Sequence, residues 1–201
     1  MMSVSEALHA RRSIRVFKPD PVSEAQVREL LDLARWSPSG GNVQPWRVIA
    51  VAGAERDAVV ALARKATMED PVGEEADRPA YPPNLWEPYR SRRFRVGEQM
   101  YERLNIPRED KPARLRHVAR NFEFFGAPVG LFYVIDRRLG YAQWAHLGMF
   151  MQSVALAATE RGLSTCMQEF WGRLRETLAH HFDLPPELMV YCGMALGYAD
   201  E

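Results

Sequence analysis

Two short stretches, RRSIR at residues 11–15 and SPSGGNVQPW at residues 37–46, decide how this chain is interpreted. The first places three guanidinium groups and a hydroxyl within five residues. This suits a phosphate, because arginine offers planar, permanently charged donors that bind two oxygens at once. In the second, the glycines and polar turn residues let backbone amides approach a ligand closely. Either stretch alone has a simpler explanation, as a solvated basic face or an ordinary turn. Together they predict a site for a phosphorylated ligand.

The order and spacing of the two stretches, and their place near the N-terminus, resemble the FMN-dependent nitroreductase family. The resemblance is sharpest over residues 7–46 and looser over residues 141–198. It implies an α+β, three-layer fold with helices around a central mixed β-sheet. It also implies a homodimer with FMN at its interface and NADH or NADPH as electron donor. In such a ping-pong oxidoreductase, FMN passes hydride to an electron-poor aromatic acceptor such as a nitroaromatic. Within the family, residues 81–90 resemble the branch that reduces nitroaromatic acids.

The resemblance also assigns residues to the cofactor. Arg11 and Ser13 would hold the phosphate with Arg12 beside it, and Arg15 would face the pyrimidine end of the flavin. The other expected contacts are Pro38, Ser39, Gly40 and Asn42 from the opposite subunit, and Met167, Gln168 and Glu169, whose backbone would approach the reactive nitrogen. No side chain is required as an obligate acid or base. Family chains usually add an arginine from a C-terminal tail, so either this sequence is truncated after Glu201 or the clamp relies on Arg11 and Arg12.

The composition predicts one domain and gives no indication of binding to nucleic acid, a membrane or a metal. The chain has 201 residues, 47% of them hydrophobic, which predicts one domain over residues 1–201 with a sizeable core. Lys+Arg and Asp+Glu are equal at 26 each, so no overall positive field attracts nucleic acid or a membrane. Cys166 and Cys192 stand in apolar surroundings without metal spacing, which indicates buried, reduced thiols and a cytoplasmic protein. The five histidines also lack metal-binding spacing.

Hydrophobic periodicity predicts an alternation of helices and strands without a regular βαβ repeat. A first helix capped by Ser3 or Ser5 delivers the arginine stretch, and a second follows the capping box that begins at Ser23. Further helices are expected over residues 54–66, 92–104, 113–125, 141–161 and 174–182, and strands over 47–52, 129–135, 163–167 and 189–196. The strand over 129–135 is apolar on both faces and therefore expected at the centre of the sheet. The helix over 141–161 should lie in the core or at a subunit interface.

Residues 67–90 interrupt this pattern with five prolines and one glycine among several aromatic side chains. So long a loop in a compact domain is usually a lid or a binding loop. We expect it to select the substrate, with Tyr81, Trp86 and Arg90 as contacts. Arg90, Arg92 and Arg93 are candidates for holding an aromatic carboxylate.

Two other functions remain open from the sequence. A reductive dehalogenase or a flavin-fragmenting enzyme would share the fold and both motifs, although Gly41-Asn42 stands where dehalogenases tend to carry an alanine-histidine pair. A non-redox module that binds flavin or phosphate would also explain the arginines. Whether NAD(P)H bleaches a bound flavin would separate binding from turnover.

Overall fold

A four-stranded antiparallel sheet in the order β1-β2-β4-β3 forms the centre of the computed structural model, which describes residues 2–74 and 81–200. The strands are β1 (Arg47–Ala52), β2 (Val129–Asp136), β3 (Ser164–Gln168) and β4 (Leu188–Gly197). The α-helices are α1 (Val4–Ala10), α2 (Glu24–Ala34), α3 (Gly53–Glu69), α4 (Tyr89–Arg103), α5 (Lys111–Ala119), α6 (Tyr141–Glu160) and α7 (Arg175–His181). Three 3₁₀ segments are η1 (Gly40–Asn42), η2 (Arg120–Gly126) and η3 (Glu169–Leu174). The α+β fold expected from the sequence is confirmed, but the three strand pairings of the sheet are antiparallel, so the expectation of a mixed sheet is wrong.

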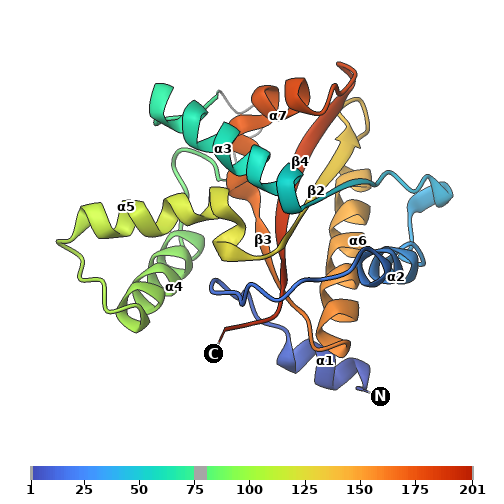
Figure 1. Ribbon diagram of the computed structural model, residues 1–201, viewed down its shortest axis with the longest axis horizontal. Coiled ribbons are helices and arrows are strands. Elements are labelled where there is room, and N and C mark those ends of the chain that lie inside the picture. Colours follow the sequence, from blue (N-terminus) through green and yellow to red (C-terminus); the bar gives the residue numbers. More distant parts are fainter. Residues whose placement is uncertain (1, 75–80, 201) are drawn as a thin grey trace.

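Helices cover both faces of the sheet, which gives three layers (Figure 1). On one face, α2 and α6 bury Leu30, Val154 and Ala155 against Leu131 and Tyr133 of β2. The opposite face is covered by α3, η2, η3 and α7, whose apolar residues form a second core cluster. β2 is buried along almost its whole length between β1 and β4, as its apolar sequence predicts. Among the described residues, parallel pairing is confined to an isolated bridge between Ser13 and Thr165.

Two glycines in the sheet make room for aromatic rings from the second cluster. A Cβ atom on Gly130 of β2 would lie 2.3 Å from Cζ of Phe124, and one on Gly193 of β4 would lie 2.2 Å from Cδ1 of Trp171. Both distances are far below van der Waals contact, so the two rings occupy the space that the Cβ atom of any other residue would need. Trp171 belongs to η3, and Gly193 therefore helps to set the path of the chain after β3.

The 113–125 helix expected from the sequence is shorter than predicted. α5 ends at Ala119, and the chain continues as η2, in which Phe124 and Phe125 adopt positive φ values of 51° and 54°. Both rings are fully buried, so packing beneath the sheet outweighs the local preference for a continuous helix. α3 is instead longer than expected and runs to Glu69. Residues 75–80 of the expected 67–90 loop lie outside the described residues.

We expect the stability of the fold to depend on pH through His117 of α5. Burial lowers its pKa, and the positive charges of Arg120 and Arg15 lower it further. The unfolded chain therefore takes up a proton at a higher pH than the folded chain, so stability falls as pH drops below about 6.5. We expect the free energy of unfolding to decrease by up to about 1.4 kcal/mol per pH unit from this group. Urea titrations of wild type and His117→Gln at pH 7.5 and 5.5 should show a smaller loss in the variant. An equal loss in both would contradict the assignment.

Candidate functional site

The arginine stretch lies alongside β3. Ser13 forms a parallel bridge with Thr165, and the N–H of Ile14 donates a hydrogen bond to the Thr165 carbonyl over 3.1 Å. Burial raises the pKa of the Cys166 thiol, and the positive charges of Arg15 and Arg11 partly oppose that rise. The bridge at Ser13 therefore brings the clustered arginines on either side of it alongside β3.

The three arginines of the stretch differ in their contacts. Arg12 is exposed and folds back onto α1, where its guanidinium donates to the carbonyls of Arg11, over 3.0 Å, and His9. Cations near the end of a helix are favoured by the helix dipole. Arg15 is half-buried, lies 6.0 Å from the ring centroid of Phe125 and donates to the Ser13 carbonyl over 3.3 Å. Arg11 and Arg15 are thus better placed than Arg12 to meet a ligand beside β3.

The edge of β3 that faces away from β4 is covered at Thr165 by the segment of Ser13 and Ile14. Thr165 uses its carbonyl on this edge to accept from Ile14, and backbone groups alternate between the two edges of a strand. The N–H and C=O of Met167 therefore face the same edge as those of Thr165. No further strand covers that edge in the described part of the chain. Met167 is 36% exposed, whereas Thr165 and Gln168 are buried.

A cleft of about 850 Å³ opens where β3 ends. Glu169 follows β3 directly and lines the cleft, together with Tyr81 from the loop before α4, Trp144 of α6 and Tyr191 of β4. The rings of Trp144 and Tyr191 meet edge to face, with centroids 5.4 Å apart. Flat, aromatic walls of this kind suit an aromatic ligand.

Gln168 is buried beside this cleft with an incomplete set of hydrogen bonds. Its amide nitrogen donates to the carbonyl of Asn121, a cleft residue, over 2.8 Å. Its Oε1 has no hydrogen-bond partner among residues 2–74 and 81–200. A buried polar atom without a partner is costly, so a ligand donor at this end of β3 would stabilise the site.

The cleft wall is anchored to the segment that precedes α4. The Glu74 carboxylate accepts hydrogen bonds from the backbone N–H groups of Glu176, over 2.6 Å, and Thr177, over 2.9 Å. Nε of Arg173, which lines the cleft, donates to the Val72 carbonyl over 2.9 Å. These contacts fix residues 71–74 against η3 and α7, and so fix one end of the expected substrate loop.

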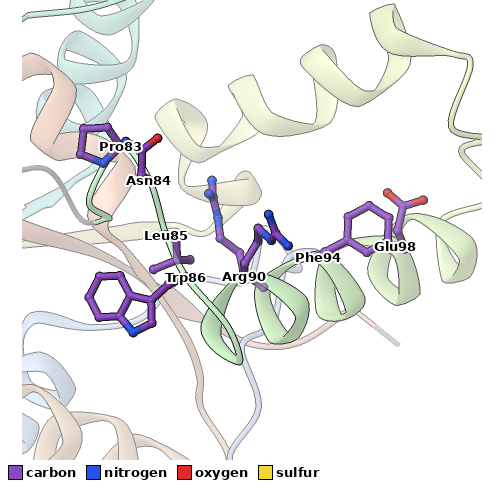
Figure 2. Close-up of a pocket in the computed structure, with 9 residues that line it drawn as sticks. Pro83, Asn84, Leu85, Trp86, Arg90, Phe94 and Glu98 are labelled. Atoms are coloured by element: carbon purple, nitrogen blue, oxygen red, sulfur yellow. The ribbon is translucent and has the colours of Figure 1, made fainter.

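A second cleft of about 700 Å³ adjoins the first, and Pro83 and Arg93 line both. Figure 2 shows Trp86 on the loop, with Arg90 and Phe94 on successive turns of α4. The three substrate contacts expected from the sequence therefore line two different clefts. Tyr81 shares a cleft with Glu169, whereas Trp86 and Arg90 line the neighbouring one.

The second motif lies elsewhere in the same chain. The Gly40 N–H contacts Nδ1 of His146 on α6 at 3.4 Å, and the Ser39 hydroxyl accepts from the Gln44 N–H over 2.9 Å. Figure 1 places this loop, in light blue, on the far side of α2 and α6 from β3. Pro38 and Asn42 are exposed there. Within one chain, the two motifs are not brought together.

Comparison with known proteins agrees with this geometry. The model of the Nitroreductase family matches residues 8–198. This chain belongs to the nitroreductase family. The nitrobenzene nitroreductase of Ectopseudomonas oleovorans is 40% identical over 197 residues, which are 98% of this chain and 87% of that protein. The 4-nitrobenzoate reductase of Pseudomonas putida is 39% identical over 195 residues, 96% of this chain and 83% of the relative.

Solved structures of nitroreductases have the same fold. The FMN- and NADPH-dependent nitroreductase NfnB of Sphigopyxis sp. strain HMH superposes with a TM-score of 0.96 at 39% identity, covering 99% of this chain and 89% of that one. NfnB of Mycobacterium smegmatis, solved with NADPH, gives 0.90 at 29% identity, with coverages of 98% and 88%. The family resemblance and the oxidoreductase class expected from the two motifs are thereby confirmed.

Several residues of the cleft beside Glu169 could not be predicted from the sequence. Asn121, Tyr191 and Arg173 belong to η2, β4 and η3, and only the folded chain brings them together. No motif joins them, so spacing in the sequence contains no signal for this grouping. Among the described residues, no His, Cys, Asp and Glu side chains form a group that could hold a metal ion. No described helix is long and apolar enough to cross a membrane.

Proposed function

We propose that this chain is an FMN-dependent oxidoreductase that takes a hydride from NADPH and reduces a nitroaromatic compound. Relatives of known activity support the reaction, because those that are about 40% identical act on nitrobenzene and 4-nitrobenzoate. NADPH is favoured as donor by the structural relatives described as NADPH-dependent. The observation that carries the proposal is the edge of β3, which has guanidinium groups at one end and an aromatic cleft at the other.

The residues along β3 fit a flavin mononucleotide. Arg11 and Ser13 offer charged and hydroxyl donors to a phosphate near Thr165. From Thr165 to Gln168 the strand advances roughly 10 Å, so one ligand with a phosphate and a flat ring can follow its edge. The unpaired Oε1 of Gln168 would accept a hydrogen bond, and the N–H of Met167, which faces away from β4, would donate one. When bound, FMN supplies the hydride chemistry, and the protein positions and shields it.

Side chains around this edge would adjust the environment of the ring. Arg15 places a positive charge near β3, and a cation beside the pyrimidine end favours negative charge there. Tyr81 and Trp144 present aromatic surfaces that exclude water from the cleft and orient a flat acceptor. No carboxylate or imidazole is needed to transfer the proton, which the acceptor ultimately takes from water.

We further propose a homodimer in which Pro38, Ser39, Gly40 and Asn42 reach the cofactor of the other subunit. Large apolar side chains are exposed in the single chain at Leu8, Trp36, Val43 and Met149, which are 52%, 82%, 50% and 46% accessible. Trp36 and Val43 flank the loop of Pro38 and Asn42, so an interface that buried them would also bring this loop to the other subunit. An obligate dimer commonly buries more than about 2,000 Å².

Light scattering should therefore give twice the 23.0 kDa mass of one chain. We expect Met149→Glu to weaken the dimer, because a charge on the exposed face of α6 would be buried without a partner. Met68→Glu, at an 83% exposed position near the end of α3, serves as the matched control and should remain dimeric. A wild-type protein that is monomeric when loaded with FMN would contradict the proposal.

The chain is proposed to act as a single domain in the cytoplasm. Both core clusters pack on one sheet, which supports one folding unit. Cys166 and Cys192 are buried and unpaired, and burial raises the pKa of the Cys192 thiol to about 12. Free thiols of this kind are common in proteins of reducing compartments.

An anaerobic titration tests the proposed reaction. Protein loaded with FMN should lose its visible flavin absorbance on addition of NADPH. It should regain that absorbance when nitrobenzene or 4-nitrobenzoate is added. A flavin that binds but is not bleached by NADPH or NADH would indicate a non-redox binding module. A reduced flavin that is reoxidised by halophenols but by no nitroaromatic would favour the dehalogenase alternative.

A further inference from the structure

Helix α4 exposes several arginines, and the structure gives them different surroundings. Nε of Arg90 donates to the Glu87 carboxylate over 2.9 Å, so its charge is already paired. Arg92 lies 6.0 Å from the ring centroid of Tyr89. The guanidinium of Arg93 lies only 4.2 Å from the ring centroid of Tyr81. Arg93 is thus the arginine of this group that is held beside the Glu169 cleft.

The charge of Arg93 is not neutralised within the described chain. No carboxylate among residues 2–74 and 81–200 forms a salt bridge with it. A guanidinium that stacks on a ring uses its face, which leaves its N–H donors available in the plane. These donors match the two oxygens of a carboxylate. Arg173, on the other side of the cleft, instead donates to the carbonyls of Pro71 and Val72.

The other residues that line the cleft indicate the chemistry of the rest of the ligand. Trp144 and Tyr191 face the cleft together with Phe170, and these groups favour a flat, apolar ring. Glu169 marks the end of β3, where the proposed flavin would present its reactive side. A ligand that reaches from Glu169 to Arg93 therefore combines an aromatic ring with an anionic substituent.

We propose that Arg93 determines specificity by binding the carboxylate of an aromatic acid in the Glu169 cleft. This inference rests on the proposed function, because it places the substrate of that reaction. Tyr81 holds the Arg93 guanidinium in position, and its own ring forms part of the wall. Arg90, which the sequence named as a substrate contact and, with Arg92 and Arg93, as a candidate for the carboxylate, is committed to Glu87 and lines the neighbouring cleft.

The test compares an acid with its uncharged analogue. We expect Arg93→Met to lower kcat/KM for 4-nitrobenzoate by roughly 10- to 100-fold, because it removes a charge-assisted hydrogen bond. For nitrobenzene, kcat/KM should change by less than about threefold, since no charge is recognised. Arg95→Met is the matched control. Arg95 stands two residues along α4 and so points to a different side of the helix, and it lines neither cleft.

A phosphate of NADPH is the other anion that Arg93 could bind. Stopped-flow reduction of the FMN-loaded protein separates the two, because it reports NADPH binding in the absence of an acceptor. We expect the apparent dissociation constant for NADPH to be the same in wild type and Arg93→Met. A rise in that constant with an unchanged preference for 4-nitrobenzoate would overturn the proposal.

An equilibrium binding experiment tests the role of Arg93 independently of the proposed reaction. Titration calorimetry of 4-nitrobenzoate into the oxidised, FMN-loaded protein needs no turnover, and Arg93→Met should weaken binding roughly 10-fold or more. Wild-type protein that binds the acid through Arg93 but reduces no nitroaromatic would refute the proposed function and leave this site intact. Equal losses for 4-nitrobenzoate and nitrobenzene, or a loss of selectivity in Arg90→Met instead, would refute the assignment of Arg93.

Discussion

Replacing Gly193 by alanine should lower the free energy of unfolding by about 1–3 kcal/mol, the usual cost of overpacking a core. The new Cβ would lie 2.2 Å from Cδ1 of Trp171, and this indole is fully buried. Its ring centroid lies 4.8 Å from that of Phe124 and 5.0 Å from that of Phe132, so it cannot move aside freely. Urea denaturation followed by tryptophan fluorescence would measure the loss.

The effect should extend to the cleft, because Trp171 lies in η3, two residues after Glu169. A helical glycine gives the matched control. A Cβ on Gly97 of α4 would meet nothing within 4 Å, so Gly97→Ala should stabilise the protein by about 0.5–1 kcal/mol. If Gly193→Ala were as stable as wild type, the close packing of Trp171 on β4 would be wrong.

Replacing Arg11 by alanine should weaken FMN binding by roughly 10- to 100-fold, which corresponds to the loss of one charge-assisted hydrogen bond. The reason is the place of Arg11 in the chain, two residues before Ser13, which forms a bridge with Thr165 of β3. Fluorescence quenching of FMN titrated with apoprotein would give the dissociation constant. Arg12→Ala should cost less, because the Arg12 side chain is directed back to α1.

Riboflavin provides the control for this prediction. It carries the same ring without the phosphate, so Arg11→Ala should leave its affinity nearly unchanged. An equal loss for riboflavin and FMN would mean that Arg11 acts on the ring or on the fold. Unchanged FMN affinity would remove Arg11 from the site.

Much of the fold could be predicted from local sequence signals. Ser23 and Gln26 form the expected capping box at the start of α2, and β1 occupies the residues that its pattern indicated. These features depend on neighbours in the sequence, which is why periodicity and capping identify them. The expected order of helices and strands, with β2 at the centre, follows from the same signals.

Features set by distant contacts could not be predicted in this way. The turn at Phe124 and Phe125 interrupts an apparently helical sequence because both rings pack beneath the sheet. Gly193 looks like an ordinary strand residue until Trp171 is placed against it. Tertiary packing overrides local propensity at these positions.

The candidate site could likewise be predicted only in part. Arg11, Ser13 and Arg15 form a compact motif, and the structure places that motif beside β3 as one unit. The substrate side is assembled from separate elements. The sequence indicated Tyr81, Trp86, Arg90 and Arg93 as candidates, but only the fold shows that Tyr81 and Arg93 share the cleft of Glu169 while Trp86 and Arg90 line the neighbouring one. Side chains brought together by the fold alone leave no spacing to detect.

A crystal structure of the FMN complex would test the central claim, that the cofactor lies along one edge of β3. We predict the phosphate within hydrogen-bond distance of Arg11 and Ser13, and the ring beside Met167 and Glu169 with its open side toward Tyr81. An FMN bound away from β3, or with its ring in the cleft of Trp86 and Arg90, would contradict the account.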